Sequence, residues 1–254
     1  MSRPNTTDRS VSVIVPALNE EGNLERTIAA VLAEIEGRLE RFQILIYDDA
    51  STDRTGVIAD ALSASRPEIR VVHNARTRGL GYSYRTGVKT AACDYVVMVP
   101  GDNEVPRAAL AAMFDSIGTA DIIAPYFTNS RIRPQGRQNV SRLFTGLVNR
   151  IVGVKLRYFN GPCIHRRDLA LAAMPATDGF AYMAVLLARL MSSGFSVREI
   201  GVPLGERASG SSKAFRMKNV VSVGASLVGL FVELRLLRRR WGMSAMVSST
   251  AARG

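Results

Sequence analysis

Asp102 and Glu104 stand two residues apart, directly after a Gly-containing turn that ends the apolar segment 96–99. Short apolar runs are typical of buried strands in parallel sheets, and open α/β sheets bind ligands at the carboxyl ends of their strands. Two carboxylates at this spacing could hold one hard cation, leaving its other coordination positions to phosphate oxygens and water. The alternative is a plain polar turn, in which Asp102 or Asn103 caps a helix that begins at Pro106.

The first half of the chain alternates between strand-like and helix-like segments, which predicts a doubly wound, mostly parallel sheet flanked by helices. The predicted strands are 11–15, 42–47, 69–73, 94–99 and 121–124, and the predicted helices are about 19–36, 51–65, 79–92 and 106–117. The first four strands each end in a polar or Gly/Pro cluster, at 16–20, 48–53, 74–81 and 100–104. In a parallel sheet these clusters share one edge, which favours a common site over four helix caps.

The second half is less regular. A basic amphipathic helix is predicted from Arg137 to Val152, with Leu143, Leu147, Val148 and Ile151 on one side. The remaining predicted elements are a turn and short strand within 158–165, a helix at 178–193, a strand at 195–200, a polar loop at 204–213 and one long helix at 214–240.

Composition and charge narrow the class of function. Apolar residues make up 47% of the 254 residues, as expected for a globular core. Two cysteines, Cys93 and Cys163, give no disulfide framework, and residues 1–10 carry no apolar signal segment, so we expect a reducing, cytoplasmic location.

The two halves of the chain differ in charge. Residues 1–130 contain 13 basic and 17 acidic side chains, whereas residues 131–254 contain 20 basic and 5 acidic side chains. This asymmetry indicates an anionic substrate, a membrane surface, or both, and no nucleic-acid-binding signature accompanies it.

The ordered clusters resemble the motifs of family 2 inverting glycosyltransferases with a GT-A fold. The matching segments are 13–21, 48–55, 78–81 and 96–106, and residues 207–213 resemble the family's R-x-x-G-x-S-K loop. The branch that the chain resembles most is that of the polyprenyl- and dolichyl-phosphate mannose and glucose synthases. The resemblance extends from about Ser10 to Lys218 and implies sugar transfer from a nucleotide-diphosphate donor, GDP- or UDP-hexose.

The resemblance implies particular contacts with that donor. Pro16, Leu18 and Glu20 stand where the family touches the nucleotide, with Leu18 in place of a usual Tyr. Tyr47 and Asp49 fall where the base and the ribose are read. The other implied nucleotide-sugar contacts are Arg78, Pro100, Gly101, Asp102, Arg131, Arg207 and Lys213.

The same resemblance implies a divalent ion, Mg²⁺ or Mn²⁺, on Asp102 and Glu104. Pro100 stands where the family has the first Asp of its D-x-D motif. The implied catalytic groups are Asp102, through the ion, and the cations Arg207 and Lys213, all of which would stabilise the leaving diphosphate.

The acceptor half is poor in carboxylates. A hydroxyl acceptor needs a general base, and only Asp178 and Glu199 are plausible, whereas a lipid phosphate is already an anion. A second departure from the family is Arg157, which replaces an Asp four residues before Gly161. The scarcity of carboxylates favours a phosphate acceptor.

The C-terminal segment Val220–Val232 is uncharged and is flanked by basic residues on both sides. Its 13 residues are too few to span a bilayer, which needs about 20. One interpretation is an amphipathic helix lying in the membrane interface, with Trp241 at its boundary. The other is a helix packed on the domain or in a dimer interface.

We therefore expect a polar tail at 1–10, a GT-A domain at 11–213 with a nucleotide-binding half (11–130) and an acceptor half (131–213), and a C-terminal helical extension at 214–254. The expected function is an inverting hexosyltransferase, peripheral at the cytoplasmic face of the membrane, acting on a polyprenyl phosphate. A soluble transferase acting on a glycan or small-molecule hydroxyl remains an alternative, as does a nucleotide-sugar-binding protein without transfer activity. The oligomeric state stays open.

Overall fold

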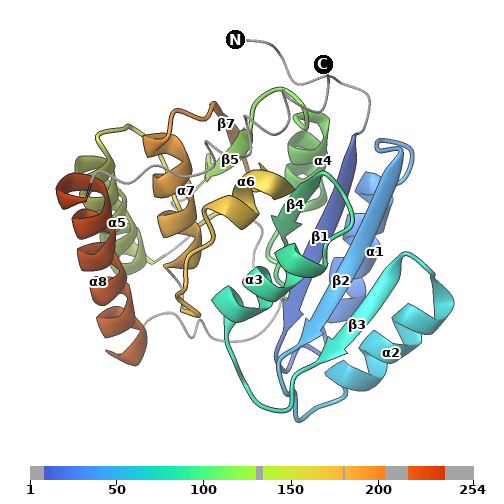
Figure 1. Cartoon of the computed structure of the whole chain (residues 1–254). Coiled ribbons are helices and arrows are strands. Elements are labelled where there is room, and N and C mark those ends of the chain that lie inside the picture. Colours follow the sequence, from blue (N-terminus) through green and yellow to red (C-terminus); the bar gives the residue numbers. More distant parts are fainter. Residues whose placement is uncertain (1–8, 130–133, 180, 204–216, 238–254) are drawn as a thin grey trace.

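A single seven-stranded sheet organises the chain in the computed structural model, which describes residues 9–129, 134–179, 181–203 and 217–237 (Figure 1). The strand order is β3-β2-β1-β4-β6-β5-β7, and all neighbouring pairs are parallel except the two that involve β6. The strands are β1 (Ser10–Ala17), β2 (Arg41–Asp48), β3 (Ile69–His73), β4 (Tyr95–Met98), β5 (Ile122–Phe127), β6 (Ile164–Arg166) and β7 (Val197–Val202). The prediction of a doubly wound, mostly parallel sheet is confirmed.

Helices cover both faces of this sheet. They are α1 (Leu24–Ile35), α2 (Thr55–Ser65), α3 (Leu80–Thr90), α4 (Arg107–Asp115), α5 (Gln135–Val152), α6 (Arg167–Ala172), α7 (Tyr182–Ser192) and α8 (Met217–Phe231), which continues as the π-helical turn η3 (Val232–Leu236). Within the described residues, no helix is long and apolar enough to cross a bilayer.

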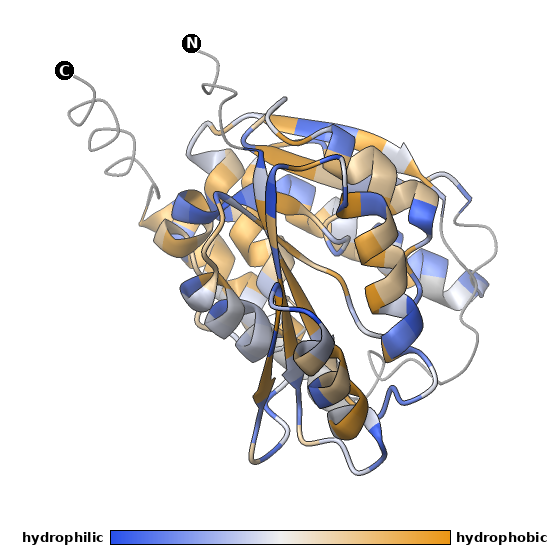
Figure 2. Ribbon diagram, turned by 90° about the vertical axis from the view of Figure 1, so that its right-hand side faces the viewer, coloured by the Kyte–Doolittle hydropathy of each residue, from blue (hydrophilic) through white to orange (hydrophobic). Residues whose placement is uncertain are grey.

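The alternation of side chains along β1 shows why two cores form. Val11, Val13 and Val15 point to one face, where they pack with α1, α2 and α4. Ile14 points to the other face and packs with α3, α6 and α7. Because both faces are buried, the central strands are almost continuously apolar, and Figure 2 shows the strands as mainly hydrophobic and the loops at their lower ends as mainly hydrophilic.

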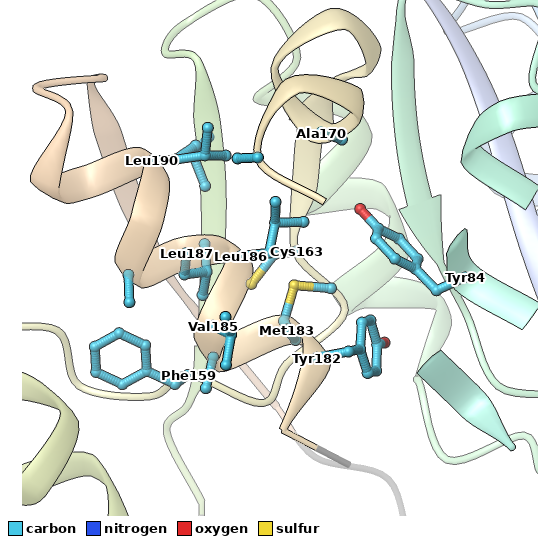
Figure 3. Close-up of a cluster of buried hydrophobic side chains, with 14 of the residues drawn as sticks. Tyr84, Phe159, Cys163, Ala170, Tyr182, Met183, Val185, Leu186, Leu187 and Leu190 are labelled. Atoms are coloured by element: carbon cyan, nitrogen blue, oxygen red, sulfur yellow. The ribbon is translucent and has the colours of Figure 1, made fainter. Parts of the chain in front are cut away.

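The core beneath α7 contains polar groups without charge (Figure 3). Tyr84 and Tyr182 pack with their ring centroids 4.9 Å apart, and the Tyr182 hydroxyl lies 3.3 Å from the Met98 sulfur. Burial lowers the pKa of His165 to about 3 and raises the pKa of the Cys163 thiol. These groups are therefore neutral parts of the core at pH 7.

The structure corrects several boundaries. β5 extends to Phe127, and α6 follows β6 directly, although no helix was predicted there. On α5, Val148 is buried, whereas Leu143 is 75% exposed, so the predicted apolar side of this helix is only partly covered. Within the described residues, the long C-terminal helix that was predicted is observed as α8 followed by η3. The predicted loop 204–213 and the helix residues 214–216 and 238–240 lie outside them.

Candidate functional site

The carboxyl ends of β1, β2, β3 and β4 lie side by side, as parallel pairing of neighbouring strands requires. Backbone hydrogen bonds tie the loops that follow them to the strand ends. The amide of Gly101, after β4, donates to the Pro16 carbonyl at 3.0 Å, and the amide of Asp49, after β2, donates to the Ala17 carbonyl at 2.8 Å. A Cβ on Gly101 would stand 3.3 Å from the same Pro16 oxygen, so a glycine suits this close approach. The four polar clusters therefore form one edge, called the catalytic edge below.

Side chains also join the loops after β1 and β2. The Asn19 amide donates to the Ser51 hydroxyl at 3.0 Å, and the Asn19 carboxamide oxygen accepts from the Thr52 amide at 2.8 Å. The Glu21 carboxylate accepts from the Arg54 amide at 3.1 Å. These hydrogen bonds hold the two loops together. Asn19 bonds to the loop after β2 and does not cap α1.

Backbone strain collects at the same edge. Among the described residues, the only non-glycine positions with positive φ are Asn19 (57°), Ala50 (64°) and Asn103 (55°). One lies in each of the loops after β1, β2 and β4. Such conformations cost about 1–2 kcal/mol for an alanine and cluster at functional sites. Their placement in three adjacent loops supports a ligand site at this edge.

Asp102 and Glu104 lie on the loop after β4. Asp102 is 8% exposed, and its carboxylate accepts from the Glu104 amide at 3.2 Å. The N-cap residue of α4 is Pro106, and no N-cap side chain of the described helices α1, α2 or α4 makes a capping bond. α4 therefore begins without a capping bond from its N-cap residue, whereas Asp53, in the loop after β2, accepts from the Thr55 amide at the start of α2 at 2.9 Å, as a capping residue does.

The donor set of this loop suits a hard divalent ion. No group of three or more His, Cys, Asp or Glu side chains within the described residues could hold a metal by itself. Mg²⁺ commonly takes one or two carboxylates and completes its shell with substrate phosphates and water, and Mn²⁺ prefers similar oxygen ligands. Asp102 and Glu104 fit an ion that arrives with a diphosphate.

Asp49 is almost fully buried and uses both carboxylate oxygens within the protein. Oδ1 accepts from the Asn74 side-chain amide and from the Arg78 backbone amide, both at 2.8 Å, and Oδ2 accepts from the Gly79 amide at 2.9 Å. Asp49 thereby fixes the loop that leads into α3. The Arg78 guanidinium, which is exposed, lies over the Tyr82 ring at 4.2 Å.

Tyr47 does not reach the catalytic edge. Its ring is fully buried in the core under α3, and its hydroxyl contacts Thr90. Tyr47 points inward because it lies on the same face of β2 as Leu45. The prediction that this side chain reads a base is wrong in this structure.

The remaining predicted contacts after β1 differ in exposure. Pro16 is buried at the end of β1, and Leu18 is partly exposed beyond it. The Glu20 carboxylate accepts from the Asn23 side chain at 2.8 Å at the start of α1. Pro100 is partly exposed next to Gly101. Leu18 and Pro100 are thus partly accessible at the ends of β1 and β4, and their contacts with a donor stay predictions.

His73 and Asp48 form a polar group that the sequence did not reveal. The two ring nitrogens of His73 lie 2.9 Å from Asp48 and 3.0 Å from Asp60. The hydrogen bond to Asp48, followed by that to Asp60, raises the pKa of His73. Burial alone would raise the pKa of Asp48, but hydrogen bonds from Ser51 and His73 outweigh it and lower that pKa. These hydrogen bonds join the end of β2 to β3 and α2.

Arg131, Arg207 and Lys213 lie outside the described residues. The strands that precede them, β5 and β7, are parallel to each other, and β6 connects β5 to β4 through two antiparallel pairings. β5 and β7 therefore point in the same direction as β4, and their carboxyl ends face the catalytic edge. The roles of these three cations stay predictions.

Asp178 and Glu199, the two candidate bases of the acceptor half, both make contacts within the protein. The Gly81 amide donates to the Asp178 carbonyl at 3.0 Å, and the Asp178 carboxylate pairs with Arg85. Near the end of β5, the Arg157 guanidinium lies 4.3 Å from the Tyr126 ring centroid, and its backbone amide donates to Glu199. Both carboxylates that could serve as a base are thus engaged by protein donors.

Comparisons with known proteins identify the family of this chain. Residues 12–171, more than half of the chain, match the sequence model of glycosyl transferase family 2. The polyprenol monophosphomannose synthase of Mycolicibacterium smegmatis is 28% identical, over 79% of each chain. The dolichol-phosphate mannosyltransferase of Pyrococcus furiosus is 28% identical over 80% of this chain and 58% of its own length. The undecaprenyl-phosphate 4-deoxy-4-formamido-L-arabinose transferase of Aeromonas hydrophila is 27% identical over 82% of this chain and 64% of its own. This chain thus spans less than two thirds of the latter two relatives.

Solved structures show the same fold. Glucosyl-3-phosphoglycerate synthase from Mycobacterium tuberculosis, in complex with phosphoglyceric acid, superposes with a TM-score of 0.65 at 21% identity, covering 87% of this chain and 80% of that one. The same enzyme has been solved with Mg²⁺ and uridine-diphosphate. At this identity the likeness concerns the fold alone. The match to the family model over more than half of the chain places this chain in glycosyl transferase family 2, and its sheet and helices have the GT-A fold.

Proposed function

We propose that this chain catalyses the inverting transfer of a hexose from GDP- or UDP-hexose to a polyprenyl phosphate. The observation that carries the proposal is the catalytic edge, where the Asp102–Glu104 loop is tied to β1 beside the strained loops after β1 and β2. The names of the relatives support the acceptor, since they include polyprenol-, dolichol- and undecaprenyl-phosphate sugar transferases.

The donor would lie across the loops of this edge. Asp49 holds the amides of Arg78 and Gly79 in place, which orients the start of α3 beside the site. Asp102 and Glu104 would bind a divalent ion together with the donor's diphosphate. That ion, when bound, supplies positive charge that stabilises the leaving diphosphate. Arg207 and Lys213 would add positive charge from the loop after β7.

The bond changes define what the acceptor must provide. An acceptor oxygen attacks the anomeric carbon from the face opposite the leaving group, a new C1–O bond forms, and the bond to the nucleotide diphosphate breaks. A hydroxyl acceptor must lose a proton to a base, whereas a phosphate monoester attacks as an anion and needs none.

The histidines and the acceptor-half carboxylates fit a phosphate acceptor, which needs no general base. Of the protein's two histidines, His165 is fully buried and His73 is held between two aspartates. In the described acceptor half, Asp178 pairs with Arg85 and Glu199 accepts from the Arg157 amide. Each of these four side chains is thus already buried or engaged with protein groups, which favours a phosphate acceptor.

The proposal is tested with purified full-length protein. Thermal-shift screening of GDP- and UDP-hexoses with Mg²⁺ or Mn²⁺ identifies the donor, and a short-chain polyprenyl phosphate then serves as acceptor. We expect a lipid-linked sugar phosphate of inverted anomeric configuration. Transfer only to glycan or small-molecule hydroxyls would instead establish the soluble transferase. Donor binding without turnover across a broad acceptor panel would establish a binding protein.

A further inference from the structure

The exposed apolar side chains of this protein are concentrated on one surface. Ten large apolar side chains are exposed among the described residues, and only Val57 and Leu171 lie away from α5, α8 and η3. Leu143 is 75% exposed and Leu147 is 44% exposed on α5, while Val228 is 66% exposed and Phe231 is 45% exposed on α8. Soluble surfaces rarely gather so many apolar side chains in one patch without a binding partner.

The two helices that carry these side chains lie side by side at one end of the molecule (Figure 1). Between them runs a groove of about 640 Å³, lined by Leu147, Ile151, Leu227 and Phe231 among others. The Arg235 guanidinium donates to the carbonyls of Arg150 and Ile151 at 3.0 and 2.9 Å, which ties η3 to the end of α5. The outward side of α5, α8 and η3, called the α5–α8 face, is therefore a continuous surface.

The charges of this face are positive. Arg142 and Arg150 are exposed on α5, and Arg235 is exposed on η3. The sequences of α5 and α8 contain no acidic residue, and the single acidic residue of η3, Glu233, pairs with Arg189. An apolar surface bordered by arginines is complementary to a bilayer whose headgroups are anionic, because the arginines meet phosphates while the apolar side chains enter the acyl boundary.

A second copy of the chain fits this face less well. A twofold dimer places the same patch of both copies together, so one positively charged surface would face another. None of these helices offers an uncompensated carboxylate to pair with them. The charge pattern therefore selects the bilayer over self-association.

We infer that the α5–α8 face docks on the surface of a membrane containing anionic lipids. The docking surface then includes α5, together with α8 and η3, and is not confined to the uncharged segment 220–232. Binding to vesicles needs neither donor nor acceptor, so this inference stands or falls independently of the proposed function.

Co-sedimentation with vesicles tests the inference. Full-length protein is mixed with phosphatidylcholine vesicles that contain or lack phosphatidylglycerol, at low and high salt. We expect binding to the anionic vesicles that weakens with salt. The double variant Leu143→Ser/Phe231→Ser should bind at least about tenfold more weakly, because two apolar side chains no longer enter the interface. Val57→Ser, at an apolar position on α2 that is 64% exposed, should bind like the wild type.

The outcomes are distinguishable. Unchanged vesicle binding by Leu143→Ser/Phe231→Ser, or no binding by the wild type, would overturn the inference. Thermal unfolding must show the same midpoint for the double variant and Val57→Ser, which excludes a folding defect as the cause. Light scattering after size exclusion covers the remaining case: a dimer that the double variant dissociates, without any effect on vesicles, would identify the face as an interface between copies.

Discussion

Gly81→Ala should destabilise the fold because α3 begins in direct contact with the acceptor half. A Cβ at Gly81 would lie 2.6 Å from the Thr177 carbonyl oxygen and 2.8 Å from the Asp178 carbonyl carbon. Both are backbone atoms and cannot rotate away. The φ of Gly81 is not in the left-handed region, so the methyl group itself, and not the backbone conformation, causes the conflict.

The magnitude follows from two opposing effects. Overpacking of this kind costs about 1–3 kcal/mol, and the short contacts with backbone place Gly81 in the upper part of that range. Alanine in a helix gains roughly 1 kcal/mol over glycine. The net loss for Gly81→Ala is thus about 2 kcal/mol in the free energy of unfolding.

Gly146→Ala is the matched control, since this glycine lies within α5 and a Cβ there would meet nothing within 4 Å. Here only the helix gain applies, so stability should rise by about 1 kcal/mol. The two variants should then differ by about 3 kcal/mol, or roughly 6–12 °C in melting temperature for a chain of this size. Differential scanning calorimetry measures this difference. A Gly81→Ala variant that melts as high as Gly146→Ala would refute the described contact between α3 and residues 177–178.

Further predictions concern the catalytic edge. Asp49→Ala should lower the free energy of unfolding by about 3 kcal/mol, because three donors lose a charged acceptor, and should raise the KM for the donor; chemical denaturation and kinetics measure the two effects. The pKa of His73 is raised in the folded protein, so protonated His73 contributes to the free energy of unfolding. This contribution is fully present below about pH 6.5 and is lost as the pH rises through the higher folded-state pKa. The variant His73→Gln should remove that part of the pH dependence of unfolding. Ala50→Gly should stabilise the protein by up to about 1 kcal/mol by relieving the positive φ, and an unchanged melting temperature would show that Ala50 is not strained.

The nucleotide-binding half could be predicted from sequence because its signals are local. β-branched runs ended by polar clusters placed β1 to β4 within a few residues, and parallel pairing then required their loops to share an edge. The direction in which a single side chain points was harder to predict from the sequence. Tyr47 stands next to the polar cluster in sequence, yet the alternation of β2 turns it into the core.

Contacts between distant segments could not be read from local patterns. The bonds of His73 to Asp48 and Asp60 need β2, β3 and α2 to be packed together. Likewise, the spacing of Leu143 and Val148 on α5 indicates an amphipathic helix, but only tertiary packing decides that Val148 is covered and Leu143 is exposed. Arg131, Arg207 and Lys213 remain predictions from the resemblance.

The central claim is that Asp102 binds the metal ion at the catalytic edge. The rate of sugar transfer by the variant Asp102→Asn tests this claim most directly. Asn keeps the size of the side chain and removes the charge that would hold the ion. Asp115→Asn, on the exposed surface of α4, is the matched control. With donor, polyprenyl phosphate and Mn²⁺, we predict that Asp102→Asn lowers kcat by at least about a hundredfold at an unchanged melting temperature, while Asp115→Asn does not. Transfer by Asp102→Asn at the wild-type rate, with the wild-type dependence on Mn²⁺, would contradict the assignment of the catalytic edge as the metal-diphosphate site.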